Sequence, residues 1–298
     1  MSNNTKSGLS RAAAKVRQAG RVLRGKNNAQ KTAPLSNIPE VKTAAEPAFP
    51  PADQGIIVDI GMNDGTDSYY YRKRGFQVIS VEAIPDLCAA VSKKFDELGI
   101  DGIDIKNFAI TDSDAEEVTF YVNKFDTEWS SVDEEIGSRA EGAEKIVVPA
   151  IDVSKLLKDV SKQIRYAKID IEGLDSVALA QIMSLPDRPP YISVENGSSD
   201  MLRTLYENGY DKFKFSNQKY THYQTIPPHS PHGKVFDYQF PDGASGLFGE
   251  DLEGEWLSYE DAMKVQKGLN LAAQHAPNNL FAVVIGWFDL HAKHSSAK

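Results

Sequence analysis

The sequence has a single cysteine, Cys88, among its 298 residues. An internal disulfide and the multi-thiolate cage of a structural zinc site are therefore excluded. We interpret Cys88 as a small buried side chain near the start of a helix rather than as a reactive thiol. So little cysteine is typical of a reducing compartment, and we expect a cytoplasmic location.

Long apolar runs are missing as well. The best candidate, residues 280–288, has nine residues, whereas about 18 to 20 are needed to cross a bilayer. We predict this run as a final buried strand and expect no transmembrane segment. The content of 41% hydrophobic and 25% charged residues is that of a globular protein with one large core.

Positive charge is scarce beyond the first 50 residues: residues 1–50 carry a net charge of +7 and the rest carries −16. A folded body this acidic lacks the positive field that nucleic acids require, so we expect no nucleic-acid partner. Residues 1–50 are rich in Ala, Ser, Asn, Lys and Arg, and this composition predicts a flexible, disordered basic arm. Its weak amphipathic pattern would allow a peripheral contact with a membrane or a protein, but a solvated tail is favoured because Ala and Val give little insertion energy.

Residues 51–298 are predicted to form one α/β domain. Short apolar runs alternate with segments of helical length, which predicts a doubly wound, mostly parallel, Rossmann-like sheet. The predicted strands are 56–60, 77–81, 105–110, 165–171 and 191–195, and the predicted helices are 66–74, 86–98, 175–184 and 199–208. Residues 117–122 and 145–150 suggest an inserted or edge strand pair. Residues 216–279, with five prolines, predict a loop-rich cap or lid.

The sharpest motif runs from Val58 to Ser68, where the first predicted strand passes into the first predicted helix. Gly61 and Gly65 permit a tight turn and a close approach of the backbone to a ligand. Glu82 ends the second strand, where a carboxylate can accept hydrogen bonds from both hydroxyls of a ribose. The loop has two glycines rather than the three of the dinucleotide fingerprint, and its acids would repel a pyrophosphate. A cationic adenosine cofactor such as S-adenosylmethionine fits better than a nicotinamide dinucleotide.

Acidic residues end several predicted strands, where ligands of doubly wound sheets bind. Carboxylates brought together at one rim have at least one raised pKa, which provides a general base near neutral pH. The candidate catalytic residues are therefore Asp170, Glu172 and Glu195. The alternative for Asp170 and Glu172 is that they stabilise the start of the following helix.

The predicted cap carries two further patterns. Residues 241–261 contain seven acids and no Lys or Arg, with Phe248 and Trp256 between them; this pattern is found where sugars bind and also in solvated loops. Three histidines, His222, His229 and His232, have uneven spacing, and we predict no metal site. After the cap, the last predicted strand carries three residues expected to support the site from below, namely Trp287, Asp289 and His291.

Residues 55–215 resemble the FkbM family of S-adenosylmethionine-dependent methyltransferases, which modify hydroxyl groups of glycans and secondary metabolites. The resemblance rests on residues 58–68, 81–85, 107–110, 129–131, 148–152, 168–173 and 192–195, in the expected order. It implies that Gly61 and Gly65 shape the methionine pocket and that Glu82 holds the ribose. The predicted cofactor-binding residues are Asp59, Gly61, Asn63, Gly65, Asp67, Ser68, Glu82, Ala83, Asn107, Ala109, Ser130, Ser131 and Asp170.

The resemblance implies O-methylation of a hydroxyl on a sugar, a glycan or a secondary metabolite, so the expected partner is a small-molecule or glycan acceptor. Two alternatives remain open at this point. One is a non-catalytic binding module of a glycan-assembly complex that keeps the nucleotide pocket, and the other is a nicotinamide-dependent oxidoreductase.

Overall fold

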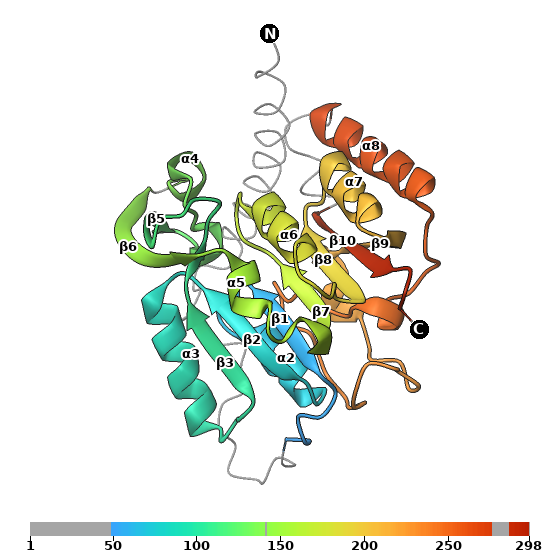
Figure 1. Ribbon diagram of the computed structural model, residues 1–298, viewed down its shortest axis with the longest axis horizontal. Coiled ribbons are helices and arrows are strands. Elements are labelled where there is room, and N and C mark those ends of the chain that lie inside the picture. The colour runs from blue at the N-terminus through green and yellow to red at the C-terminus, as the bar shows by residue number, and fades with distance from the viewer. Residues whose placement is uncertain (1–48, 141, 276–285, 298) are drawn as a thin grey trace.

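The main sheet of the protein confirms the predicted doubly wound α/β fold. The computed structural model describes residues 49–140, 142–275 and 286–297 (Figure 1). Seven strands lie in the order β3-β2-β1-β7-β8-β10-β9. The first five are parallel, and β10 runs antiparallel to both of its neighbours. The strands are β1 (Ile56–Ile60), β2 (Gln77–Glu82), β3 (Ile103–Asn107), β7 (Ile164–Ile169), β8 (Tyr191–Glu195), β9 (Tyr210–Asn217) and β10 (Phe288–His294).

One face of this sheet is covered by α5 (Val153–Leu157), α6 (Asp175–Met183), α7 (Ser199–Glu207) and α8 (Tyr259–His275). The other is covered by α2 (Thr66–Lys73) and α3 (Pro85–Glu97) together with loops. The short helix α4 (Glu134–Gly137) packs on the strand Glu117–Asn123, outside the main sheet. In β1 every residue is buried, because Val58 packs toward α6 while its neighbour Ile57 packs toward α2. A strand covered on both faces needs this continuous apolar run.

A second, three-stranded sheet confirms the predicted insertion. It consists of β4 (Ala109–Ile110), β6 (Ala143–Ile151) and β5 (Glu117–Asn123), with β5 antiparallel to β6. The prediction of one strand over 105–110 was wrong, because the chain leaves the main sheet after Asn107 and β4 pairs with β6 instead. This change of sheet occurs beside the end of β2.

The C-terminal part differs from prediction in two respects. Residues 259–275, predicted as part of a loop-rich cap, form the helix α8, which packs against α7 and β9 (Figure 1). The last strand is Phe288–His294 rather than 280–288, and residues 280–285 lie outside the described residues. The change follows from pairing, since β10 fills the gap between β8 and β9.

Residues 224–258 form the loop-rich cap, and most of it packs on the face of the sheet that carries α2. The Phe248 ring stacks on Tyr166 with a centroid distance of 4.2 Å. The buried Arg74, which follows the last residue of α2, forms an ion pair of 2.9 Å with Asp251. The cap therefore takes the place of a helical layer, and only a short part of it reaches the edge of the sheet where β1 ends.

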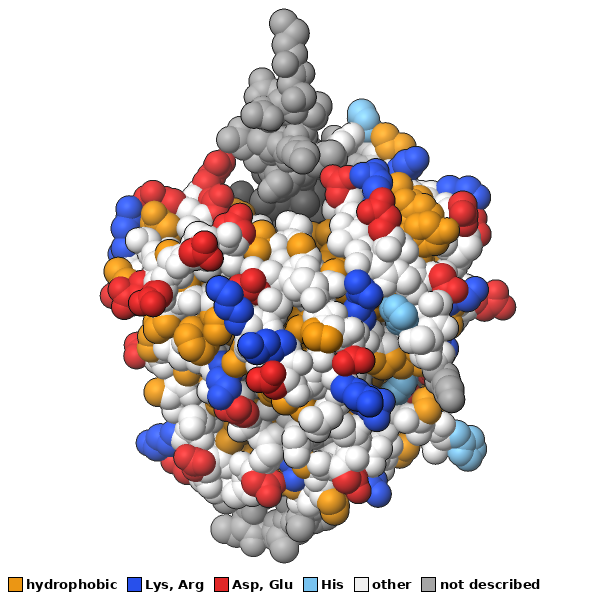
Figure 2. Space-filling model, in the orientation of Figure 1, with side chains coloured by type: hydrophobic (Ala, Val, Ile, Leu, Met, Phe, Trp, Pro, Cys, Tyr) orange, Lys and Arg blue, Asp and Glu red, His pale blue; other side chains and the backbone are white. Residues whose placement is uncertain are grey.

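Over the face seen in Figure 2, Lys and Arg side chains are interspersed with Asp and Glu. Within the part of the chain that the structure describes, no helix is both long and apolar enough to span a bilayer. The basic arm lies almost wholly outside that part, which begins at Phe49.

Candidate functional site

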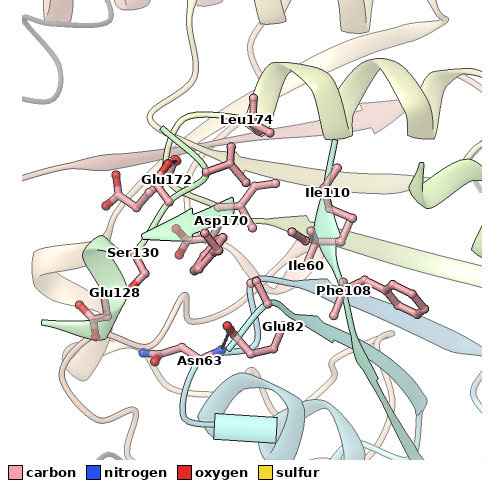
Figure 3. A pocket seen from close by; sticks show the side chains of 18 of the residues that line it. Ile60, Asn63, Glu82, Phe108, Ile110, Glu128, Ser130, Asp170, Glu172 and Leu174 are labelled. Carbon is pink, nitrogen blue, oxygen red and sulfur yellow. Dashed lines mark hydrogen bonds between the residues drawn. The ribbon is translucent and has the colours of Figure 1, made fainter. Parts of the chain in front are cut away.

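Two adjoining pockets lie where β1, β2 and β7 end. The first, which we call the apolar pocket, lies between β1, β2, β4 and the segment after β7 (Figure 3). The second, which we call the charged pocket, reaches from the loop after β1 to the cap residues 242–244. Four residues line both pockets and mark their junction: Gly61, Asn63, Glu128 and Asp170.

Glu82, at the end of β2, is one of the acids that line the apolar pocket. One carboxylate oxygen accepts from the backbone N–H of Asn63 at 2.9 Å (Figure 3). The other accepts from the backbone N–H of Ile84, also at 2.9 Å. Burial raises the pKa of Glu82, and these hydrogen bonds oppose the rise. The carboxylate is thus fixed at the pocket wall, with lone pairs left over for further donors such as ribose hydroxyls.

The structure gives the two glycines of the loop a packing role. A Cβ on Gly61, whose φ is +88°, would lie 2.0 Å from the carbonyl oxygen of Asp170. A Cβ on Gly65 would lie 2.6 Å from a methyl group of Val91. Both glycines are predicted to permit a tight turn and the close approach of a ligand, and the structure adds a packing reason: Gly61 contacts the residue after β7, and Gly65 contacts α3. Gly61 still lines both pockets, but Gly65 lines neither.

A buried lysine, Lys168 of β7, lies at the centre of the acids. Its ammonium is 3.2 Å from Asp59 Oδ1, 3.2 Å from Asp67 Oδ2, 3.2 Å from the Gly61 carbonyl oxygen and 3.9 Å from Asp170 Oδ2. Burial lowers the pKa of Lys168, but the surrounding carboxylates outweigh this effect and raise the pKa well above its usual value. The lysine is therefore charged and neutralises part of the acidity predicted for this loop.

Asp59 and Ser68 lie beneath the pockets rather than in their walls. Asp59 is fully buried and accepts a hydrogen bond of 2.6 Å from the Ser68 hydroxyl, which also bonds Ser80. Burial raises the pKa of Asp59, against the lowering effect of Lys168. Both residues support the loop from below, whereas Asp67 is part of the charged pocket.

Asp170 and Glu172 follow β7 and both face the apolar pocket (Figure 3). The Asp170 side chain is 25% exposed and also lines the charged pocket. Glu172 is more buried and forms an ion pair of 3.2 Å with Arg139. Of these two candidate bases, Asp170 is the one at the junction of the pockets.

Of the remaining residues predicted to bind the cofactor, four line the apolar pocket and one, Asn107, supports its lining from outside. Ala83, Ala109, Ser130 and Ser131 line the apolar pocket. The Ser130 hydroxyl accepts from the Asn123 N–H, and the Ser131 hydroxyl donates to the Glu172 carbonyl oxygen. Asn107 lines neither pocket; its side-chain amide donates to the carbonyl oxygens of Glu82 and Ala83 at 2.9 and 3.0 Å.

Glu195, the third candidate base, lines neither pocket. It is buried at the end of β8, opposite Asp289 of β10 in the strand register. Burial raises the pKa of Asp289 to about 8, and the charge of Asp170 contributes to the rise. His291 is buried further along β10, and burial lowers its pKa to about 3. These residues lie behind the pockets.

The aromatic and histidine patterns of the cap do not gather at the pockets. Phe248 is in the core, and the Trp256 indole donates to Glu250. His232 Nε2 accepts from the Glu250 N–H.

Cys88 of α3 is buried, which raises the pKa of its thiol to about 12.

Sequence reasoning missed several residues of the charged pocket. Lys168 lies in β7, two positions before Asp170, and a charged residue within a buried strand was the available signal. Thr66, Glu128 and Asp242 come from α2, the turn before Ser130 and the cap. Their meeting depends on long-range packing that no local pattern encodes.

Several solved structures are similar to this chain in part. An rRNA methylase from Streptococcus thermophilus is 15% identical, with 61% of this chain and 82% of that chain covered and a TM-score of 0.30. Coclaurine N-methyltransferase bound to N-methylheliamine and SAH is 10% identical, with coverages of 80% and 66% and a TM-score of 0.34. A SAM-dependent methyltransferase from Aquifex aeolicus is 8% identical, with coverages of 57% and 79% and a TM-score of 0.30. A comparison with curated proteins finds no match.

The profile of the methyltransferase FkbM domain matches residues 59–212, which is slightly more than half of the chain. The matched region contains β2, β7 and the end of β1, which together form both pockets, and S-adenosylmethionine is the cofactor. The apolar pocket fits its adenosine, because it combines apolar walls with a carboxylate at the end of β2. The chain belongs to the FkbM family of S-adenosylmethionine-dependent methyltransferases.

Proposed function

We propose that this methyltransferase methylates a hydroxyl group of a sugar, a glycan or a secondary metabolite. The observation that carries the proposal is the position of Asp170, whose partly exposed carboxylate lies at the junction of the two pockets. A cofactor group in the apolar pocket and an acceptor hydroxyl in the charged pocket would meet beside the Asp170 carboxylate.

The cofactor is held by the apolar pocket and the adjacent part of the charged pocket. Glu82 accepts hydrogen bonds from the ribose hydroxyls, and the adenine lies against Phe108, Ala109 and Ile110. The amino-acid tail extends past Gly61 and Asn63 toward the charged pocket. None of the described residues that line the apolar pocket is Lys or Arg, which suits an uncharged adenosine better than a pyrophosphate. The bound cofactor supplies a methyl group on a sulfonium, which is already activated for transfer.

Asp170 acts as the general base. Its carboxylate would accept the proton of the acceptor hydroxyl, whose oxygen takes the methyl group while the bond from that methyl carbon to the sulfonium sulfur breaks and leaves a neutral thioether. The Lys168 ammonium lies 3.9 Å from Asp170 Oδ2, on the side away from the apolar pocket, whose described lining residues include no Lys or Arg. Glu172 is less suited because Arg139 pairs with it, and Glu195 lies outside both pockets.

The proposal is tested by methyl transfer from S-adenosylmethionine to a panel of sugars, glycans and hydroxylated metabolites, with products identified by mass spectrometry. Asp170→Asn keeps the size of the side chain and removes the base, so turnover falls by about 10²- to 10⁴-fold while cofactor affinity changes little. Asp96→Asn, on the exposed side of α3, serves as the matched control. Full turnover by Asp170→Asn refutes this base, and cofactor binding without any transfer favours the binding-module alternative.

The domain assignment forms part of the same proposal. Residues 51–298 constitute the methyltransferase domain, and residues 1–50 are a basic arm outside it. The arm's contact with a membrane surface or a protein and the cytoplasmic location stay predictions, because residues 1–48 lie outside the described residues.

A further inference from the structure

The walls of the charged pocket are strongly acidic. Five carboxylates line it, from Asp64, Asp67, Glu128, Asp170 and Asp242. Among the described residues in its walls, Lys168 is the one cation. The cofactor brings at most a net charge of +1, so a negative field remains in the pocket when the cofactor is bound.

Lys168 offers little to an anionic acceptor. An ammonium has three N–H donors, and the Lys168 ammonium already has three oxygens at 3.2 Å, from Asp59, Asp67 and Gly61. A phosphate or carboxylate on the acceptor would have to displace one of these partners while close to the remaining acids.

Two of the carboxylates converge on the side of the cap. Asp242 precedes Gly243, and a Cβ on Gly243 would lie 3.3 Å from Glu128 Oε1. The turn that carries Glu128 and the cap segment that carries Asp242 therefore approach closely. Cap residues 242–244 line the charged pocket but not the apolar pocket, so this side faces away from the predicted adenosine position.

A second, independent feature points to a polar ligand here. Thr66, the first residue of α2, lines the charged pocket and is 6% exposed. Its hydroxyl has no hydrogen-bond partner among the described residues. A buried hydroxyl without a partner costs free energy, and a polar group of a ligand in the pocket would satisfy it.

From these features we infer that the acceptor carries a protonated amino group beside hydroxyl groups, as in an amino sugar, and that Glu128 and Asp242 bind this ammonium. The inference rests on the proposed function, because it names the acceptor class for the same site. Thr66 bonds a neighbouring hydroxyl, and Asp170 faces the hydroxyl that is methylated. Acceptors with phosphate or carboxylate groups are disfavoured by the same acids.

The test measures binding separately from methyl transfer. The full chain saturated with S-adenosylhomocysteine is titrated calorimetrically with glucosamine, N-acetylglucosamine and glucuronate, which present a cation, a neutral amide and an anion. Glucosamine is expected to bind at least about tenfold more tightly than N-acetylglucosamine, with glucuronate weakest. Asp242→Asn should remove most of this preference, while Asp237→Asn, an exposed acid of the same cap, should retain it.

Equal affinities for glucosamine and N-acetylglucosamine, no binding of any of the three, or a preference that survives Asp242→Asn would overturn the inference. Affinity for S-adenosylhomocysteine, measured for each variant, shows that the variant is folded. A methyl-transfer assay on the same sugars separates the two proposals. Preferred binding of glucosamine without an O-methyl product would uphold the ammonium site and contradict the proposed O-methylation. Equal O-methylation of all three sugars would uphold the proposed O-methylation and contradict the ammonium site.

Discussion

Replacing Gly61 by alanine tests the packing on which the junction of the two pockets depends. The added Cβ would lie 2.0 Å from the Asp170 carbonyl oxygen, so β1 and β7 would have to separate at their ends. The φ of +88° adds about 1–2 kcal/mol for a residue with a Cβ, and the overlap adds about 1–3 kcal/mol. We expect the free energy of unfolding to fall by about 2–5 kcal/mol in total.

Denaturation by urea gives this free energy, and Gly254→Ala is the matched control. Gly254 has a similar φ of +84°, but a Cβ there would meet nothing within 4 Å. The control should therefore lose only the conformational part, about 1–2 kcal/mol. The difference between the two variants measures the crowding against Asp170. Equal losses in both variants would refute the packing role that the structure assigns to Gly61.

Three further predictions concern buried charges. Lys168→Met should destabilise the protein by about 3–5 kcal/mol, because Asp59 keeps a buried charge without its partner; urea denaturation measures the loss, and Asp59→Asn in the same chain should recover part of it. Arg74→Met should cost a similar amount by removing the partner of Asp251, and limited proteolysis should then cut within residues 224–258. The pKa of Asp289 is raised from 3.8 to about 8, so the folded state holds more protons than the unfolded state between these values; stability should fall as pH rises from about 4 to 8, and Asp289→Asn should reduce that fall.

Each of these predictions has a result that contradicts it. If Lys168→Met is as stable as the unmodified chain, the negative charge of the surrounding acids does not depend on Lys168 for its neutralisation. Resistance of the Arg74→Met cap to protease would show that aromatic packing alone holds the cap on the sheet. A pH dependence of unfolding that is the same with and without Asp289 would show that this carboxyl has an ordinary pKa in the folded protein.

Local sequence patterns were sufficient for the parallel half of the sheet. The apolar run of β1 and the alternation of strand and helix required only neighbouring residues. The helix α8 was missed because few of its residues are buried, Ala262 and Gln266 among them, so it lacks a clear apolar stripe. The final strand was misplaced because β10 is defined by its pairing with β8 and β9.

The site shows the same division between local and long-range information. Glu82 and Asp170 were found because strand ends predict ligand positions in this class of sheet. The packing role of Gly61 could not be predicted from local sequence, because its close neighbour Asp170 is more than a hundred residues away in the chain. Lys168 was part of the motif 168–173 but was given no role, because its partners Asp59 and Asp67 come from β1 and α2.

The most direct test of the account is a calorimetric titration of the full chain with S-adenosylmethionine, compared with Glu82→Gln. Glu97→Gln, on the exposed surface of α3, is the matched control. The account predicts saturable binding at one site, unchanged in the control and weakened about 10- to 100-fold in Glu82→Gln, because hydrogen bonds from the ribose to a charged acceptor are lost. Equal affinity of Glu82→Gln and the unmodified chain would contradict the placement of the cofactor at the end of β2.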